Sequence, residues 1–459
     1  MKKYAYTLTL LLLSAIGWSS KAQVTQQSRP NVVIIMADDL DTRQLSCYGG
    51  KNIQTRNIDK LAGEGLKFNN IYASHATCVP TRASLFTGLY PMRHGSFQNH
   101  KPVYPNMKSV GHYLANVGYQ VALTGKDHST RPASAFPFEI IKGFQPQCTS
   151  SNDEYELDDV EKFMTNQQKP FCLFIMSINP HKPWDQGDPT EFNADKLILP
   201  PSMVDTKETR KEYCNYLAEI RRLDNQVGDV MAMLKKTGQD KNTIFMFLGE
   251  QGPQFAGGKW NCWDLGQKSS MIVRWPNQIK PNIQTNAIVQ YEDITPTLID
   301  IAGGKAIDSL DGKSFLPVLK GNSKTARSYA YGIYNNIPEG PAYPMRSLRD
   351  ERYKLILNLS PEKTYGIKWY NGPGDLGVWK SWNDKAETNA EAKFLVNRIK
   401  HRPAIEFYDT LKDPYELNNL ANNPSYKKQI DTFSKVLKDW MKQQHDDGAS
   451  VDRVYAKQN

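Results

Sequence analysis

Four short apolar runs, each followed by residues with helical periodicity, constrain the fold of this chain more than any other feature. The runs occupy residues 31–36, 119–124, 171–178 and 243–248. Continuous apolar runs of this length are typical of strands that are covered on both faces. Between them, the stretch 213–237 repeats apolar residues at the spacing of an amphipathic helix. This alternation predicts an α/β fold with a mostly parallel central sheet flanked by helices.

The texture of the sequence changes beyond about residue 340, after the Pro- and Gly-rich stretch 337–344. Residues 349–359 predict a strand with a polar edge, and residues 426–444 predict an amphipathic closing helix. We therefore expect three segments: a signal peptide at 1–22, an α/β domain at 23–340 and a smaller C-terminal α+β subdomain at 341–459.

The N-terminus has the layout of a cleavable export signal. Lys2 and Lys3 precede an apolar run at 8–16, and small residues lead to Ala22 before Gln23. The run is shorter than a good membrane span. The cleavage site has no cysteine, so nothing there indicates a lipid anchor. A buried N-terminal helix is the alternative. The pattern predicts a periplasmic or secreted protein with no stable membrane anchor.

The charge balance favours an anionic small partner over nucleic acid. The formal net charge of +9 falls to +6 once Lys2, Lys3 and Lys21 leave with the signal. This modest excess suits an anionic substrate, and no block of lysines or arginines resembles a nucleic-acid footprint. The six cysteines are scattered without a CxxC pair, which argues against a zinc site. An exported protein could pair some of them, with no pairing indicated by the sequence, and Cys172 is expected in the core.

Reactive residue types follow directly after each of the four predicted strands. They are Asp38, Asp39, Lys126, His128, Asn179, His181, Glu250 and Gln251. Because ligands bind outside the carboxyl ends of parallel strands, we expect these side chains along one rim of the sheet. Carboxylate and amide oxygens suit calcium, or magnesium, and the lysine and histidines would hold an oxyanion and move protons. The cluster predicts a site that hydrolyses an anionic ester, with a plain loop role as the alternative for each residue alone.

Cys78 is the candidate nucleophile. Pro80 fits the first position of a helix, which places Cys78 at a helix N-terminus where negative charge is favoured. Arg82 lies one turn along the same helix and would neutralise that charge. A thiolate there would be nucleophilic, but a hard cation prefers oxygen ligands, so the two halves of the site do not match.

The segment 78–88, Cys-Val-Pro-Thr-Arg-Ala-Ser-Leu-Phe-Thr-Gly, resembles the signature of type I sulfatases of the alkaline phosphatase superfamily. Further motifs of that family have counterparts at 30–39, 124–128, 179–181, 293–298 and 311–321. The resemblance as a whole runs from about residue 30 to 425. It implies that a formylglycine-generating maturase oxidises Cys78 to formylglycine (3-oxoalanine). The hydrated aldehyde would then be the nucleophile and would offer oxygens to calcium, which removes the mismatch.

The resemblance also implies roles by position. The calcium ligands would be Asp38, Asp39, the modified Cys78, Glu250 and Gln251. The catalytic residues would be Cys78, Arg82, Lys126, His128, His181 and Lys259. In these roles, Arg82 and Lys126 hold the aldehyde hydrate, and His128 is the base that drives sulfate expulsion. His181 and Lys259 bind sulfate, and one of them protonates the leaving oxygen.

One departure from the family pattern concerns the metal site. Glu250-Gln251 stand where many members have Asp followed by His or Asn. Each side chain is longer by one methylene but carries related donor and acceptor groups. Calcium tolerates this flexibility better than magnesium does. We take the pair as a subfamily trait, with a weakened site as the alternative.

The substrate is expected to be a sulfated polysaccharide or its oligosaccharides, either algal, such as ulvan or carrageenan, or a glycosaminoglycan. The export signal, the basic charge and the tryptophans of the C-terminal part favour this class. The Glu-Gln-Gly sequence followed by Lys-Trp also resembles a polysaccharide-degrading group near heparan N-sulfatases. Candidate sugar contacts are His75, His100, Trp260 and Arg346, each with a structural role as the alternative.

Two other functions stay open at this point. One is hydrolysis of phosphate or phosphonate esters by the same fold. The other is a catalytically inactive glycan-binding protein, against which the intact Cys78 motif argues, since a binding protein has no use for an oxidisable cysteine there.

Overall fold

The structure is a computed structural model that describes residues 29–148, 155–372 and 375–448. The predicted signal peptide lies outside these ranges. The main sheet has the order β4-β3-β5-β1-β6-β7-β2-β8. Its strands are β1 (Asn31–Met36), β2 (Leu66–Tyr72), β3 (Gln120–Gly125), β4 (Glu139–Ile140), β5 (Phe171–Met176), β6 (Thr243–Leu248), β7 (Lys268–Arg274) and β8 (Ile283–Gln290). Only β7 runs antiparallel to its neighbours in this described sheet, so the predicted mostly parallel sheet is confirmed.

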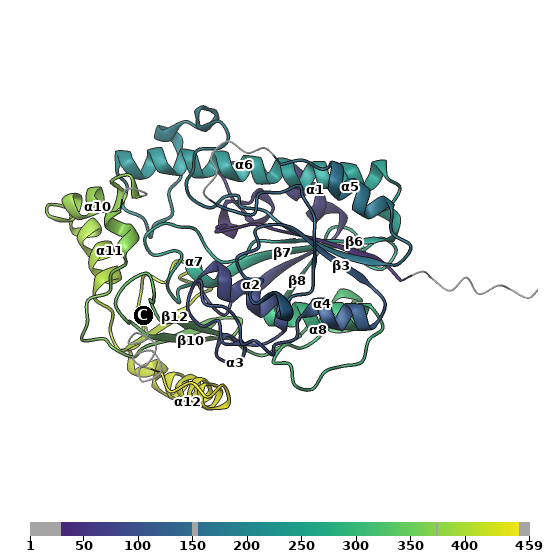
Figure 1. The fold of residues 1–459 in the computed structure, drawn as a ribbon. Coiled ribbons are helices and arrows are strands. Elements are labelled where there is room, and N and C mark those ends of the chain that lie inside the picture. Colours follow the sequence, from purple (N-terminus) through teal and green to yellow (C-terminus); the bar gives the residue numbers. More distant parts are fainter. Residues whose placement is uncertain (1–28, 149–154, 373–374, 449–459) are drawn as a thin grey trace, which may run out of the picture.

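Helices cover both faces of this sheet. In Figure 1, α1, α5 and α6 lie above the sheet, and α4 and α8 lie below it. The helices of the chain are α1 (Arg56–Glu64), α2 (Cys78–Thr87), α3 (Pro91–His94), α4 (Val110–Asn116), α5 (Asp158–Thr165), α6 (Lys207–Lys236), α7 (Asp264–Gln267), α8 (Ile294–Ile301), α9 (Leu316–Leu319), α10 (Val378–Ala386), α11 (Ala390–Lys400) and α12 (Lys427–Gln443). The long α6 contains the amphipathic stretch that the sequence predicted.

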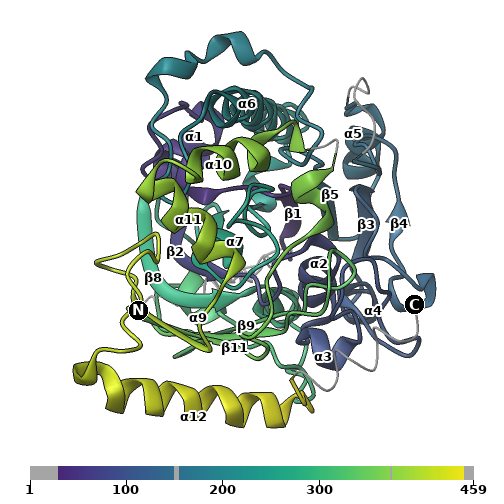
Figure 2. The same cartoon turned by 90° about the vertical axis from the view of Figure 1, so that its left-hand side faces the viewer.

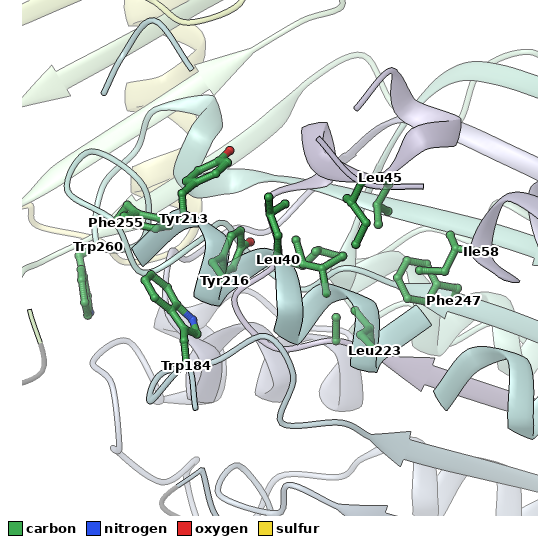
Figure 3. Close-up of a cluster of buried hydrophobic side chains, with 14 of the residues drawn as sticks. Leu40, Leu45, Ile58, Trp184, Tyr213, Tyr216, Leu223, Phe247, Phe255 and Trp260 are labelled. Carbon is green, nitrogen blue, oxygen red and sulfur yellow. The ribbon is translucent and has the colours of Figure 1, made fainter. Parts of the chain in front are cut away.

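Strand β1 shows why its sequence is continuously apolar. Val33 and Ile35 pack into the core cluster beneath α6, part of which Figure 3 shows with Tyr213 and Tyr216 of that helix. The alternate residues of β1 point to the opposite cluster, which α2, α4 and α8 cover. Because successive side chains of a strand point to opposite faces, a strand covered on both faces needs apolar residues throughout.

A second, antiparallel sheet forms the C-terminal part, in the order β12-β11-β10-β9. Its strands are β9 (Ala330–Tyr334), β10 (Met345–Arg349), β11 (Tyr353–Asn358) and β12 (Ile405–Asp409). Figure 2 shows α12 along the outside of this sheet, where Phe433 and Leu437 pack against Leu355 and Phe407. The smaller α+β part is therefore confirmed. Its sheet begins at Ala330, ahead of the predicted boundary at 340.

Two further observations concern membranes and cysteines. Within the described ranges, no helix has both the length and the apolar character needed to span a bilayer. All six cysteines lie in these ranges, and each is a free thiol there. Cys172 is fully buried, as predicted for a core residue.

Candidate functional site

The four strands whose ends carry reactive residues are neighbours in the sheet. Strands β3, β5, β1 and β6 lie side by side and parallel, so their carboxyl ends share one edge. The sheet hydrogen bonding continues just past the strands, since Asp38 N–H donates to the Asn179 carbonyl at 3.0 Å and Lys126 N–H donates to Met176 at 2.8 Å. The predicted rim therefore exists, and it brings together residues far apart in the sequence.

Three fully buried acids form the centre of this rim. Asp38 and Asp39 follow β1, and Glu250 follows β6; one carboxylate oxygen from each lies within 4.8 Å of those of the other two. Each acid has a buried cationic partner. Lys126 pairs with Asp38, Lys259 Nζ lies 2.7 Å from Asp39 Oδ2, and Arg82 Nε lies 2.5 Å from Glu250 Oε1. Each pair offsets part of the cost of burying an acid in the interior.

The donor set also has unused oxygen atoms. Asp38 Oδ1 and Gln251 Oε1 are buried and have no hydrogen-bond partner, while the Gln251 amide donates to Asp39. Buried polar atoms normally have a partner, so orphaned acceptors beside three carboxylates indicate a place for a cation. Asp38, Asp39, Glu250 and Gln251 offer only oxygen to such an ion, and this set fits calcium.

The surroundings shift the pKa values of the three acids in different directions. Burial acts to raise the pKa of Asp38, but Lys126, His181 and Arg82 outweigh it and hold that pKa well below its usual value. Burial raises the pKa of Asp39 to about 6, against the effect of Lys259. Burial likewise raises the pKa of Glu250 despite Arg82. A bound cation would favour the charged form of all three.

Left-handed backbone conformations occur at the turns that build the site. Asp39 has φ 61°, Glu250 has φ 66°, Trp260 has φ 74° and His100 has φ 63°. This conformation costs a non-glycine residue about 1–2 kcal/mol, so its recurrence around one site indicates turns held by their surroundings. At Glu250 the support is visible, because its backbone N–H donates to the Tyr291 hydroxyl at 2.7 Å.

Cys78 is the first residue of α2, in the buried space beside the acids. Thr77 caps the helix without a side-chain hydrogen bond. Pro80 is therefore the third helical residue and not the first, as the sequence had suggested; its missing N–H is harmless anywhere in the first turn. Burial raises the pKa of the Cys78 thiol, against the effects of Lys126 and Lys259. Its Sγ lies 3.7 Å from Asn99 Oδ1.

The two predicted catalytic histidines lie at the edge of the cluster. His181 contacts the Lys182 carbonyl through Nδ1, which must donate there, and this leaves Nε2 free at 3.5 Å from Asp39 Oδ2. Burial, followed by the charge of Lys126, lowers the pKa of His128 to about 4. Its Nδ1 is buried without a partner, so it is available to accept a proton.

Of the four candidate sugar contacts, only His100 is exposed. His75 is buried against the Tyr334 ring, with 5.4 Å between the ring centroids. Trp260 is buried in the core cluster of Figure 3. Arg346 is buried and binds Asp446 through Nε at 2.5 Å and Nη2 at 2.9 Å. The Arg346 guanidinium is thus engaged by Asp446, whereas His75 Nε2 and Trp260 Nε1 are buried without a hydrogen-bond partner among the described residues.

Sequence reasoning missed Asn99 and Cys148, which contact the site, and Glu339, which contacts Asn99. Asn99 lies against Cys78 and donates to Glu339 Oε1 at 2.8 Å. The Cys148 thiol donates to Asp38 Oδ2 at 3.3 Å. None of Asn99, Cys148 and Glu339 directly follows a predicted strand. The search for reactive residues at strand ends therefore could not find them.

Comparisons with known proteins give two family matches and several relatives. The model described as "Sulfatase" matches residues 30–304, and one described as "N-sulphoglucosamine sulphohydrolase, C-terminal" matches residues 259–371. The chain is 33% identical over 421 residues to an "Ulvan-active sulfatase" of Formosa agariphila, covering 91% of this chain and 81% of that protein. It is 25% identical to human "N-sulphoglucosamine sulphohydrolase", covering 92% of this chain and 91% of that protein.

A comparison with solved structures gives a similar fold. The solved structure of BT4656 in complex with its substrate D-glucosamine-2-N,6-O-disulfate superimposes with a TM-score of 0.71 at 22% identity. The match covers 92% of this chain and 99% of that chain, so the two architectures correspond along nearly their whole length.

Proposed function

Because this chain belongs to the sulfatase family of hydrolases, we propose that it is a calcium-dependent sulfatase that removes sulfate esters from sulfated polysaccharides or their oligosaccharides. The observation that carries the proposal is the position of Cys78, at the start of α2 within the cluster of three acids and three cations. Ulvan oligosaccharides are the first substrate class to test, given the ulvan-active relative.

In this proposal, Asp38, Asp39, Glu250 and Gln251 hold calcium, and the cation supplies positive charge that stabilises the anionic ester. Formylglycine made from Cys78 by a maturase supplies, in its hydrated form, a hydroxyl nucleophile whose oxygens suit that cation. Arg82 fixes Glu250, and Lys126 fixes Asp38 beside residue 78. These contacts orient the donors before substrate binds. Such preorganised groups are usually the largest source of electrostatic stabilisation of a transition state.

The remaining side chains handle sulfate and protons. Lys259 Nζ and His181 Nε2 both lie near Asp39 Oδ2, at 2.7 and 3.5 Å, so they face one point of the site from different loops. We assign them to the sulfate oxygens, with one donating a proton to the departing alcohol. His128 accepts a proton through its free Nδ1 when sulfate leaves.

We also propose that the protein is exported to the periplasm or secreted, with residues 23–340 as the catalytic part. The basis is the N-terminal sequence, with its lysines, apolar run and small residues before Gln23. N-terminal sequencing of the protein from its native host is expected to start at Gln23. A mature chain that starts at Met1 would contradict export by this signal.

The reaction is tested by sulfate release from a panel of sulfated algal and animal oligosaccharides, with the enzyme expressed beside a formylglycine-generating enzyme. We expect release in calcium, loss of release in EGTA and recovery when calcium is restored. Matched phosphate and phosphonate esters should react more slowly. Faster turnover of those esters would assign the alternative hydrolase activity. No release, with residue 78 shown by mass to be formylglycine, would favour a glycan-binding protein.

A further inference from the structure

An exposed tryptophan and lysine lie together in the short helical turn at Lys368–Asn371. Trp369 is 42% exposed, among the few large apolar side chains left in water. The Lys368 ammonium lies 5.1 Å from the centroid of the Trp369 ring. Within the described ranges, Lys368 Nζ has no carboxylate partner, unlike the ammonium groups of Lys126 and Lys259. The ammonium group lies over one face of the ring, and the exposure of Trp369 leaves other ring surface in water. A cation without a carboxylate partner next to exposed aromatic surface has the chemistry of a site for an anionic sugar.

A chain of contacts connects this turn to Cys78. Lys368 N–H donates to the Glu339 carbonyl at 2.8 Å. The Glu339 carboxylate accepts from Asn99 at 2.8 Å, and Asn99 Oδ1 lies 3.7 Å from Cys78 Sγ. A series of contacts therefore runs from Cys78 through Asn99 and Glu339 to the backbone of the turn at 368–369.

His100 extends this series of contacts. Its Nε2 lies 3.2 Å from Asn99 Nδ2, and its ring centroid lies 6.4 Å from that of His128. After burial, the charges of Lys259, Lys126 and Lys368 lower its pKa, in that order. The imidazole is therefore close enough to the ammonium groups of both the reaction centre and the turn for their charges to act on it.

Glu339 contributes an unused acceptor. The residue is 3% exposed, and its Oε2 is buried with no hydrogen-bond partner. A buried acceptor of this kind is normally satisfied, and a sugar hydroxyl is a suitable donor. Glu339 forms no ion pair with Lys368 in the described structure, so the ammonium group stays available to a ligand.

We propose that Lys368, Trp369, His100 and Glu339 form a subsite for the sugar next to the sulfated one, and that this sugar carries its own acidic group. Trp369 stacks on the ring, Lys368 binds the carboxylate or second sulfate, and Glu339 accepts from a hydroxyl. His100 contacts the sugar between the two charged centres. The inference rests on the proposed sulfatase activity and deepens it, since it selects polyanionic chains over isolated sulfate esters.

The test compares two oligosaccharides that differ in one group. One carries a carboxylate on the sugar next to the sulfated residue, and the other is the same compound with that carboxylate reduced to an alcohol. The wild-type enzyme is expected to show kcat/KM about tenfold higher for the acid, as for one charge-assisted hydrogen bond. Lys368→Gln should remove this preference and leave the reduced compound unaffected, and added salt should weaken the preference.

Two variants and one further substrate complete the design. Trp369→Ala should raise KM for both oligosaccharides and leave a small aryl sulfate unchanged, because the aryl ester does not reach the turn. Lys393→Gln removes an exposed lysine on α11 and is the matched control, with no expected effect on any substrate. An oligosaccharide with a second sulfate in place of the carboxylate shows which anion the subsite prefers.

The outcomes separate the two proposals. A wild-type enzyme that releases no sulfate from any ester would overturn the proposed function. An active enzyme with equal kcat/KM for the acid and the alcohol, or a Lys368→Gln variant that keeps the preference, would overturn the subsite alone.

Discussion

Replacing Cys78 by alanine is expected to lower sulfate release by at least about 10⁴-fold, because loss of a covalent nucleophile removes nearly all rate enhancement. The fold should persist. Cys78 is buried at the start of α2, but its thiol makes only a long contact to Asn99, and alanine is a good helix residue. The measurement is sulfate release in calcium by wild type and variant, both expressed with the maturase.

The control for this prediction is Cys47→Ser, which changes a half-buried thiol outside the site and should keep full activity. Mass analysis should find formylglycine at residue 78 in the wild type and in the control. Activity in Cys78→Ala above one part in about 10⁴ would show that water or another side chain attacks sulfur directly. That result would remove residue 78 from the mechanism and leave calcium to Asp38, Asp39, Glu250 and Gln251.

The central strands were predictable because their physics is local. The predicted bounds of β1 and β6 agree with the structure, and those of β3 and β5 differ by one or two residues. These strands are buried on both faces, so their sequences are continuously apolar. Strand β8 was missed because its first half is exposed and reads Ile-Gln-Thr-Asn. A strand at the edge of a sheet is partly exposed, so its sequence need not contain a continuous apolar run.

The strand predicted at 349–359 corresponds to β11, but the prediction began four residues too early. Residues 349–359 were expected as one strand, but the chain turns at Asp350, whose carboxylate accepts from Arg352 N–H at 2.7 Å. Strand β10 ends before this turn, and β11 follows it. The turn is short and the two strands that it joins are largely buried, so the hairpin became visible only in the structure.

The site was predictable where topology alone assigns position. Asp38, Lys126, His181 and Glu250 follow adjacent parallel strands, and the strand order brings them together without further information. Asn99, Cys148 and Glu339 come from loops whose course depends on long-range packing, so no pattern placed them. The burial of His75 and Arg346 could not be predicted, because the sequence does not show whether a polar side chain has a partner inside the protein.

Lys259→Met is expected to lower kcat/KM by about 10²–10³-fold, the effect of removing one preorganised donor from a developing negative charge. Methionine keeps most of the side-chain length and removes only the charge. The same substitution has a second effect that depends on calcium. In EGTA it leaves Asp39 buried beside no ammonium partner, and breaking a buried pair in this way costs about 3–5 kcal/mol of folding free energy.

Calcium should reduce that loss of stability, because a cation held by Asp39 takes over the compensation that Lys259 provides in its absence. The measurement is urea unfolding of wild type and variant in calcium and in EGTA. Lys354→Met is the matched control. Lys354 of β11 is buried and its Nζ lies 2.8 Å from Asp264 Oδ1 of α7, away from the calcium ligands, so the stability that this substitution costs should be equal in both buffers. Equal destabilisation of Lys259→Met in both buffers would exclude Asp39 as a calcium ligand. A loss of stability confined to EGTA, together with low activity in calcium, would show that one lysine neutralises the empty metal site and binds sulfate once the metal is present.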